Sequence, residues 1–397
     1  MKINRRLAIQ ALLGGAVTTP LLRTQANEGQ QADASATAPG LKVLDLKTIS
    51  QPTDRYYGWP TVARRSNGDL LLVASGGRQH HVCPFGRVDL LQSFDQGDSW
   101  TFARTIADGP IDDRDAGILE TTQGTLLVTT FTSLAYEPIL QKAEATAGTD
   151  KPSMPAEQLR QWRAAHARLA PGEHAQHLGC WMLRSEDGGL NWSNPSRCPL
   201  NSPHGPTQLR DGSLLYAGKM LWEEPHTVGV CRSTDDGRNW SAPLAIPTRP
   251  GDSHQDYHEL HGVEAADGTL IVHIRNHNTA HKGETLQTHS GDGGRTWATP
   301  YSIGVWGLPS HLLKLRDGRL LMTYGHRRQP LGNQARISED HGRSWSAPLV
   351  LYGDGTSGDL GYPSTVELSD GRLLTVWYER LAGNPLSQLR AARWRLG

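Results

Sequence analysis

An eight-residue pattern, Ser-x-Asp-x-Gly-x-x-Trp, recurs five times along the chain. The copies begin at Ser93, Ser185, Ser233, Ser290 and Ser338. The pattern suits a strand that turns back on itself, because the Ser and Asp side chains can hydrogen-bond turn amides, while Gly takes a positive φ and Trp packs beside the hairpin. Five near-identical hairpins predict a protein that is built from structural repeats.

A second series of turns sets the number of repeats. An Asn-Gly, Gln-Gly or Asp-Gly pair lies between two hydrophobic segments six times, which is a β-hairpin signal. The glycines are Gly68, Gly124, Gly212, Gly268, Gly318 and Gly371. Six units of two hairpins predict an all-β fold, a six-bladed β-propeller with four-stranded antiparallel blades. The last unit is one strand short, and we expect Lys42 to Ile49 to supply that strand and close the ring.

The long interval between Gly124 and Gly212 indicates an insertion in the second blade, over residues 133–177. Within it Leu159, Trp162, His166 and Leu169 repeat at helical spacing, and Pro155 fits the first turn of a helix. The insertion is therefore expected to carry a short amphipathic helix over one mouth of the propeller. This helix has two readings, as a lid or as a packing element that covers apolar surface.

The N-terminal segment has the composition of an export signal. Arg5 and Arg6 precede an apolar run to Val17, and Thr24-Gln25-Ala26 follows, so residues 1–26 are expected to be a signal peptide of the twin-arginine type or of the ordinary secretory type. Residues 27–41 are expected to be a flexible spacer, and residues 42–397 a single propeller domain. The expected location is periplasmic or secreted. No later segment is long and apolar enough to span a bilayer.

Charge and cysteine content exclude several classes of partner. The 40 basic and 40 acidic residues cancel, which gives no reason to expect a nucleic acid or an anionic membrane as partner. The four cysteines lack zinc-type spacing, so disulfides or buried thiols are expected, with a pairing that the sequence does not fix. We expect no metal ion and no cofactor. The cysteines are Cys83, Cys180, Cys198 and Cys231.

The connectivity of four-stranded blades places both series of turns on one face of the ring. The opposite face is then formed by the loops between second and third strands and by the crossings between blades. These segments hold every histidine of the chain except His273, His289 and His341. Because titratable side chains concentrate at functional sites, we expect the site at this mouth.

Two segments at the mouth resemble those of the non-viral sialidase superfamily, the Asp-box (BNR repeat) six-bladed propellers. His258-Glu259-Leu260-His261-Gly262, followed by Arg275, is similar to the segment that supplies the catalytic glutamate and an arginine of the carboxylate-binding triad. Gly361-Tyr362-Pro363-Ser364-Thr365 is similar to the segment with the tyrosine nucleophile. The resemblance thus implies Glu259 and Tyr362 as catalytic residues, with Arg275 and either Arg327 or Arg328 binding a carboxylate. The alternatives are an ordinary strand tyrosine at 362 and a structural ion pair between Glu259 and Arg275.

The chain also departs from that superfamily at two places. Gly58-Trp59-Pro60 stands where the superfamily has Arg-Ile-Pro, and the loop at 78–87 has no aspartate for proton transfer. His80 or His81 is expected to transfer the proton instead. Arg78, Arg87 or Arg114 is expected to replace the absent arginine, since the planar guanidinium matches a carboxylate. Further candidates for substrate binding are Trp59, which can stack on a sugar ring or simply pack, and His204, His258 and His311.

Three functions follow from these residues. The first is an exported glycoside hydrolase that removes a terminal acidic sugar, a sialic-acid-like residue or a sugar of a uronic-acid-containing glycan, from an oligosaccharide or polysaccharide. In it a tyrosine nucleophile avoids placing a carboxylate against the carboxylate of the substrate. The second is a polysaccharide lyase that uses His or Tyr to abstract the proton beside a uronate carboxylate. The third is a propeller that binds glycans without reaction, since the fold alone does not decide function.

Overall fold

The computed structural model describes residues 40–397, and the predicted signal peptide and residues 27–39 of the predicted spacer lie outside the described residues. Six four-stranded antiparallel sheets make up the described chain, each of them a blade. Blade 1 is β2 (Tyr56–Arg64), β3 (Leu70–Arg78), β4 (Arg87–Ser93) and β5 (Arg104–Ala107). Blade 2 is β6 (Asp112–Glu120), β7 (Leu126–Ser133), β8 (Cys180–Ser185) and β9 (Ser196–Arg197). Blade 3 is β10 (Thr207–Gln208), β11 (Leu214–Lys219), β12 (Val228–Ser233) and β13 (Leu244–Ala245).

The second half of the chain repeats this plan. Blade 4 is β14 (Tyr257–Glu264), β15 (Leu270–Asn276), β16 (Glu284–Ser290) and β17 (Tyr301–Trp306). Blade 5 is β18 (Ser310–Lys314), β19 (Leu320–His326), β20 (Gly332–Ser338) and β21 (Leu349–Tyr352). Blade 6 is β22 (Leu360–Glu367), β23 (Leu373–Arg380), β24 (Ser387–Leu396) and β1 (Leu41–Thr48). The first strands of neighbouring blades contact one another, as β2 does with both β6 and β22. The predicted six-bladed propeller is confirmed.

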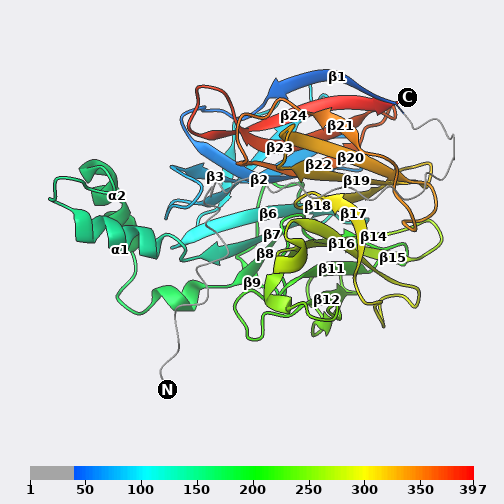
Figure 1. The fold of residues 1–397 in the computed structure, drawn as a ribbon, viewed down its shortest axis with the longest axis horizontal. Helices are drawn as coiled ribbons and strands as arrows, with labels where there is room; N and C mark the ends of the chain where they lie inside the picture. The colour runs from blue at the N-terminus through cyan, green and yellow to red at the C-terminus, as the bar shows by residue number, and fades with distance from the viewer. Residues whose placement is uncertain (1–39) are drawn as a thin grey trace, which may run out of the picture. The chain divides into compact units, whose positions relative to one another are not determined.

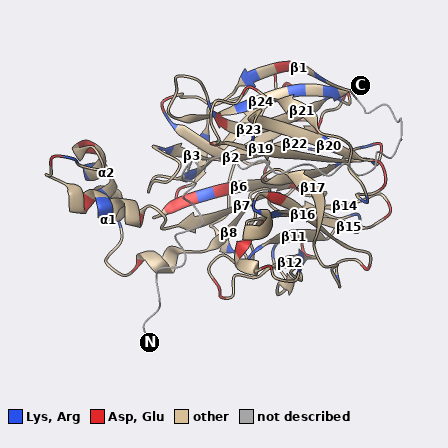
Figure 2. Ribbon diagram, in the orientation of Figure 1, with Lys and Arg blue, Asp and Glu red and all other residues tan. Residues whose placement is uncertain are grey.

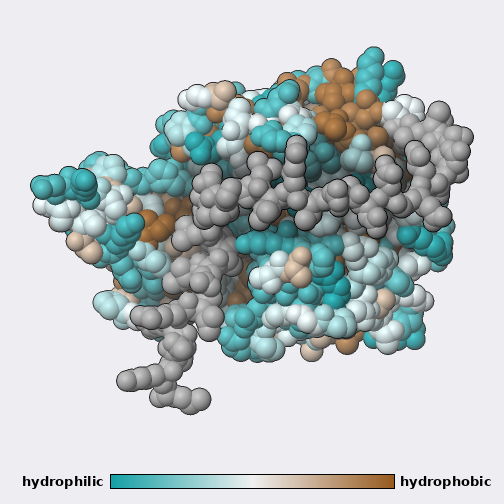
Figure 3. Space-filling model, viewed as in Figure 1, coloured by the Kyte–Doolittle hydropathy of each residue, from teal (hydrophilic) through white to brown (hydrophobic). Residues whose placement is uncertain are grey.

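The ring is closed by strands from the two ends of the described chain. Strand β1 pairs with β24, with Leu41 opposite Leu396 and Thr48 opposite Arg390, and Figure 1 shows the blue and red strands side by side. The strand predicted over 42–49 is therefore confirmed. Strand β1 is the outer edge of its blade, and apolar side chains gather over β1 and β21 in Figure 3. The exposed large hydrophobic residues of these two strands are Val43, Leu44, Leu46 and Val350.

The repeated Ser-x-Asp-x-Gly-x-x-Trp segments form the predicted turns. In the first copy the Ser93 hydroxyl donates to Asp95 Oδ1 at 2.8 Å and accepts from the Gly97 amide at 2.8 Å. Gly97 has φ of +88°, and the Ser99 amide donates to Asp95 Oδ1 at 2.9 Å. The other four copies repeat the bonds from the serine. The five tryptophans pack on five different inter-blade clusters of apolar side chains.

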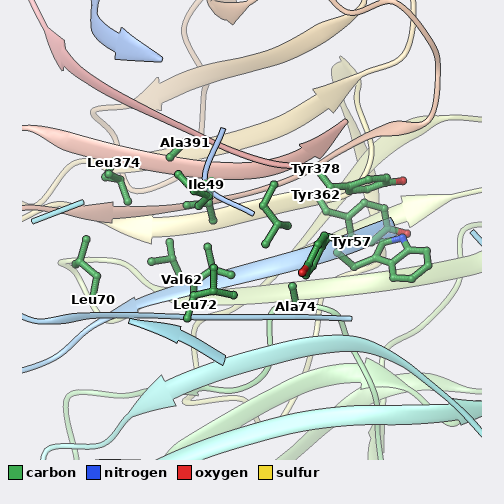
Figure 4. Packing of buried hydrophobic residues seen from close by; sticks show 14 of the residues in the cluster. Ile49, Tyr57, Val62, Leu70, Leu72, Ala74, Tyr362, Leu374, Tyr378 and Ala391 are labelled. Carbon is green, nitrogen blue, oxygen red and sulfur yellow. The ribbon is translucent and has the colours of Figure 1, made fainter. Parts of the chain in front are cut away.

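The hydrophobic core lies between the blades rather than at the centre of the ring. Six clusters of buried apolar residues each join two neighbouring blades, so every blade is held by both of its neighbours. The cluster between blades 6 and 1 runs from Leu70 and Leu374 at one end to Tyr362 and Tyr378 at the other (Figure 4). This packing fixes the position of Tyr362, whose ring is 5% exposed.

The insertion after β7 carries two helices, α1 (Glu137–Thr146) and α2 (Ala156–His166), followed by the 3₁₀ turn η1 (His174–His177). Figure 1 shows α1 and α2 beside the sheets, in green. The predicted helix is confirmed as α2, with Pro155 before its first residue and Leu159 and Trp162 buried. Helix α1 was not predicted, because it buries only Leu140 and Ala143 and so lacks a clear apolar stripe.

The cysteines and the helices settle two further expectations. Every cysteine of the chain lies in the described part, and each is a free, buried thiol, as one of the two alternatives for these residues expected. Between residues 40 and 397, no helix combines the length and the hydrophobicity that crossing a bilayer requires.

Candidate functional site

Four of the six inner strands break their register at the same position. A β-bulge or irregularity interrupts β2 before Thr61, β6 before Gly117, β14 before His261 and β22 before Ser364. In each case a non-glycine residue there adopts a positive φ, which costs of order 1–3 kcal/mol and clusters at functional sites. The four residues are Trp59 (φ +53°), Asp115 (+42°), Glu259 (+43°) and Tyr362 (+54°). Each lies nine residues before the glycine of its blade's Asx-Gly or Gln-Gly turn, Gly68, Gly124, Gly268 and Gly371 respectively.

Two of these bulge residues and one arginine form a contact network. The Tyr362 hydroxyl donates to Glu259 Oε1, although 103 positions separate the two residues. Arg275 lies opposite His258 on the neighbouring strand β15. Its Nη1 atom is 2.5 Å from Glu259 Oε2 and donates to the Tyr362 hydroxyl oxygen at 3.1 Å. The ring closure thus brings together the three residues that the resemblance singles out.

The charges of this network are set by burial and by its own hydrogen bonds. Burial raises the pKa of Glu259, but the Arg275 cation and the hydrogen bonds from Tyr362 and Arg275 bring this pKa below its ordinary value. Burial, together with the Glu259 charge, raises the pKa of Tyr362 well above its usual range. The site at neutral pH therefore contains a carboxylate that accepts a hydrogen bond from a neutral phenol. His277 accepts from Arg275 Nε at 2.8 Å, and burial lowers its pKa to about 3.

Arg327 and Arg328, the two alternatives for the second carboxylate-binding arginine beside Arg275, differ in their placement. The Arg327 guanidinium lies 5.9 Å from the ring of Tyr362, and its Nε donates to the Leu360 carbonyl at 2.9 Å. Arg328 is exposed and lies 5.0 Å over the ring of Trp306. Arg327 therefore adjoins the network, and Arg328 does not extend toward Tyr362.

Asp115 is a site residue that sequence reasoning missed. It takes the bulge position on β6 that Glu259 and Tyr362 take on β14 and β22, so it is placed at the same opening from blade 2. Burial, and then the charge of Glu259, raise the pKa of Asp115 to about 7, so that this carboxyl group is largely protonated below neutral pH. The signal that locates it is the distance of nine residues to Gly124, which Trp59, Glu259 and Tyr362 share in their own blades. Figure 2 shows the acidic and basic residues that alternate along β6.

Trp59 follows Gly58, which stands where the superfamily has an arginine, and two arginines pack against the Trp59 ring. Its ring is 2% exposed, lies 6.4 Å from that of Tyr362, and has the Arg114 guanidinium 4.5 Å and the Arg78 guanidinium 5.0 Å from its centre. Arg114 is 3% exposed, and its Nη1 lacks a hydrogen-bond partner within the described residues. A buried donor without a partner calls for a ligand or water. This Nη1 atom lies 3.7 Å from Asp112 Oδ2, an ion pair without a hydrogen bond, so it can still donate to an anion, whereas Arg87 Nε donates to Asp89 Oδ1 at 3.0 Å.

Arg78 is engaged in a buried ion pair. Its Nη1 and Nη2 atoms donate to the two carboxylate oxygens of Asp112 at 2.6 and 3.0 Å, and both side chains are fully buried. Arg78 Nη2 and Nε also donate to the carbonyls of His81 and His80, at 3.0 and 3.3 Å. The arginine therefore holds the loop after β3 in place.

We expect Arg78→Met to destabilise the propeller by about 3–5 kcal/mol, because the buried Asp112 carboxylate loses the hydrogen bonds from Arg78 to both of its oxygens and keeps only the Arg114 guanidinium 3.7 Å away. The measurement is the free energy of unfolding from urea titration. Arg160→Met serves as the control, since it removes an arginine from an exposed pair with Glu157 and should leave the free energy almost unchanged. Equal effects of the two substitutions would contradict this account of Arg78.

The two histidines of this loop differ in their surroundings. His81 Nδ1 lies 3.0 Å from Asp359 Oδ1 and 2.8 Å from the Tyr56 hydroxyl, and within residues 40–397 Nε2 has no hydrogen-bond partner. The centre of the imidazole ring lies 5.0 Å from that of the Trp59 ring. Burial lowers the pKa of His81, although Asp359 opposes this effect. A neutral, oriented imidazole of this kind can accept a proton. His80 is exposed.

The remaining predicted histidines lie near the axis and beside β11. His204 and His311 pack with His261, with ring centres 4.6–5.3 Å apart, and burial lowers the pKa of all three well below the usual range. His258 lies 4.8 Å from His277 between ring centres. Lys219, which the sequence reading missed, approaches His258 Nδ1 at 3.5 Å, and burial lowers the pKa of this lysine to about 8.

The three comparisons with known proteins are consistent with this geometry. Residues 156–375 match the family described as BNR repeat-like domain. A sialidase of Bacteroides fragilis is 24% identical over 208 residues, which are 43% of this chain and only 38% of that protein. A protein of unknown function from Dyadobacter fermentans has the same fold, with a TM-score of 0.72 at 23% identity over 90% of this chain and all of that one. The intramolecular trans-sialidase from Ruminococcus gnavus, in complex with oseltamivir carboxylate, has a TM-score of 0.62 at 15% identity, over 86% of this chain and 94% of that one.

Proposed function

This chain belongs to the BNR repeat-like domain family of the sialidase superfamily of propellers, and we propose from this premise that it is a glycoside hydrolase that removes a terminal acidic sugar from a glycan. The observation that carries the proposal is the contact of Tyr362 with both Glu259 and Arg275. A phenol hydrogen-bonded to a buried carboxylate is a nucleophile paired with its base. Export of the enzyme remains a prediction from residues 1–26.

The first half of the proposed reaction forms a bond to Tyr362. Glu259 takes the phenol proton as the Tyr362 oxygen attacks the anomeric carbon of the sugar, and the bond from that carbon to the leaving oxygen breaks. Asp115 gives its proton to the leaving oxygen. The raised pKa of Asp115 supplies this proton near neutral pH, while the lowered pKa of Glu259 keeps the base ionised.

The second half restores the enzyme. A water molecule attacks the anomeric carbon and gives its proton to the Asp115 carboxylate, while the bond to Tyr362 breaks and the proton on Glu259 returns to the phenolate. The net change is hydrolysis with retention at the anomeric carbon, because each half inverts it once. A tyrosine nucleophile suits an acidic sugar, since a neutral phenol does not repel the sugar's carboxylate as it approaches.

Three arginines around the opening support an anionic substrate. Arg275, Arg327 and Arg114 approach the Tyr362 hydroxyl, the Tyr362 ring and the Trp59 ring respectively. We propose that they bind the carboxylate of the sugar, with Arg114 in place of the arginine that is absent at Gly58. The site then differs from an Arg-Ile-Pro site in the position of one cation, so we propose a substrate other than a common sialoside.

The proposal predicts different effects for two adjacent arginines. Arg327→Ala should raise KM by about 10- to 100-fold, because it removes charge-assisted hydrogen bonds to the sugar's carboxylate. Arg328→Ala is the matched control and should leave KM near that of the wild type, since this side chain is exposed over Trp306. Steady-state kinetics on the same substrate measure both. A larger effect at Arg328 would reverse the assignment.

One observation favours a second function, a polysaccharide lyase. His81 presents a free Nε2 from a neutral ring that Asp359 orients, as a base for a proton beside a uronate carboxylate would require. In that reaction His81 takes the proton from the carbon beside the carboxylate, and the bond from the next carbon to the leaving oxygen breaks. The leaving oxygen takes a proton from water, and the sugar gains a carbon-carbon double bond.

The two reactions are distinguished by their products. The purified protein is incubated with sialylated, uronic and rhamnose-uronate oligosaccharides in ¹⁸O-labelled water, and the products are weighed by mass spectrometry. Hydrolysis predicts one released acidic sugar that carries ¹⁸O. If the chain is cut without the addition of water and the product gains ultraviolet absorbance, the protein is a lyase. Binding without any product would assign a glycan-binding propeller.

A further inference from the structure

Three metal-ligating side chains meet in the helical insertion, away from the Tyr362 network. Glu137 is the first residue of α1, His166 is the last residue of α2, and His174 is the first residue of η1. One possible ligand atom from each lies within 4.8 Å of the other two. This is the one such group of three or more in residues 40–397, and these residues play no part in the proposed hydrolysis.

Hydrogen bonds fix which nitrogen of each imidazole remains available. His174 Nε2 lies 2.9 Å from the carbonyl of His166, and a carbonyl only accepts, so Nε2 carries the proton and Nδ1 keeps its lone pair. His166 Nδ1 lies 3.1 Å from the Tyr136 hydroxyl, so Nε2 is the nitrogen of this ring that can bind a metal ion. Metal-ligating histidines typically donate their other N–H to a carbonyl or another acceptor in this way. The two rings are nearly parallel, 16° apart, with centres separated by 4.0 Å.

We propose that Glu137, His166 and His174 bind a divalent transition-metal ion, with zinc as the expected occupant. The ligands are the Glu137 carboxylate, His166 Nε2 and His174 Nδ1, a set of two imidazoles and one carboxylate that zinc accepts in tetrahedral sites. Such a set leaves one position of the tetrahedron for water. Ligands about 2.0–2.2 Å from one ion lie closer together than 4.8 Å. Because the two imidazole rings are stacked, one of them must also turn out of the stack before both nitrogen lone pairs point at the same ion.

The ion would tie together three segments of the insertion that otherwise share a modest core. Tyr136, Leu140 and Trp162 pack there with residues of the mouth loop such as Cys83. Helix α2 also contacts that loop directly, because Trp162 Nε1 donates to Gln79 Oε1 at 2.9 Å and Gln79 Nε2 donates to Gln161 Oε1 at 2.6 Å. Gln79 is followed by His80 and His81. The metal is thus positioned to stabilise the insertion and, through it, one wall of the mouth.

The test uses zinc and cobalt on the full chain. After removal of bound metal with a chelator, equilibrium dialysis against Zn²⁺ should give one ion per chain, and Zn²⁺ should raise the Tm. Co²⁺ in place of zinc should give the intense visible absorption of a four-coordinate site with nitrogen and oxygen ligands. His174→Ala should weaken Zn²⁺ binding by more than about 100-fold, since even partners behind the ligands contribute about 10- to 100-fold.

Two further variants separate loss of the ligand from loss of the fold. Glu137→Gln keeps the size of the side chain and removes its charge, so it should weaken zinc binding while the circular dichroism spectrum stays that of the wild type. His177→Ala removes another histidine of η1 and should bind zinc as the wild type does. Wild-type protein that binds no Zn²⁺, or that binds it equally well in all three variants, would overturn the proposal. These results do not depend on turnover, so they stand apart from the test of the hydrolase.

Discussion

Replacing Tyr362 with Phe is expected to lower kcat/KM by about 10⁴-fold or more, as loss of a nucleophile does in other enzymes. The substitution removes only the hydroxyl, which donates to Glu259 and accepts from Arg275, and the ring remains packed between blades 6 and 1. The propeller should therefore stay folded, with a near-ultraviolet circular dichroism spectrum like that of the wild type.

The matched control is Tyr324→Phe. Tyr324 is also a buried tyrosine with a hydrogen-bonded hydroxyl, which donates to Gln334 at 2.8 Å on blade 5. It should keep wild-type turnover, because its hydroxyl does not face the network. If Tyr362→Phe turned over the true substrate at the wild-type rate, the phenol would not be the nucleophile.

Asp115→Asn is expected to lower kcat by about 10²- to 10⁴-fold, the usual contribution of a general acid. The loss of kcat should depend on the leaving group of the substrate. An acidic phenol can depart as the phenolate ion and so needs no proton from Asp115. Turnover of such an aryl glycoside should largely recover in the variant. This recovery separates proton donation from a structural role, which would slow both substrates alike.

The pH profile gives an independent reading of the same carboxyl group. The acid must be protonated, and its pKa is raised to about 7, so kcat should fall as the pH rises through about 7. The lower limb belongs to Glu259, which must be ionised and whose pKa is lowered, so it should lie below pH 4.5. In Asp115→Asn the alkaline limb should disappear.

Two variants test whether another group controls that limb. Asp113 lies on the same strand with a pKa also raised to about 7 by burial, but its carboxylate accepts from the Gly109 amide at 2.6 Å. Asp113→Asn should therefore leave the alkaline limb in place. His81→Asn should leave it in place as well. If His81→Asn lost the alkaline limb and Asp115→Asn kept it, His81 and not Asp115 would be the proton donor.

The fold was predictable because its signals are local and repeated. Each Asx-Gly turn and each Ser-x-Asp-x-Gly-x-x-Trp segment is fixed by hydrogen bonds within a few residues. The local sequence pattern is therefore sufficient to predict the turn. The closing strand was predictable by counting, since blade 6 lacked one strand and residues 42–49 lacked a partner. Helix α1 was not, because its stability comes from packing against α2 and the mouth loop rather than from its own pattern.

The candidate site was predictable for residues whose positions within a blade match those of the superfamily's site residues. Glu259, Arg275 and Tyr362 lie together as the resemblance implies. The choice between Arg327 and Arg328 depends on which of two adjacent side chains turns inward, and the sequence does not record this direction. Asp115 was not predicted, because the superfamily has its aspartate in the loop after β3, whereas Asp115 lies at the bulge of the next inner strand, β6.

The central claim is that the sugar becomes bonded to Tyr362 during turnover, and the most direct test is peptide mass spectrometry of a trapped intermediate. A fluorinated analogue of the acidic sugar found by the product screen, with fluoride as the leaving group, slows the breakdown of the glycosyl-enzyme more than its formation. We predict that the peptide containing Tyr362 gains the mass of one glycosyl unit and that Tyr362→Phe gains none. A glycosyl group on Glu259 or another side chain, or complete turnover of the analogue without any adduct, would contradict the account.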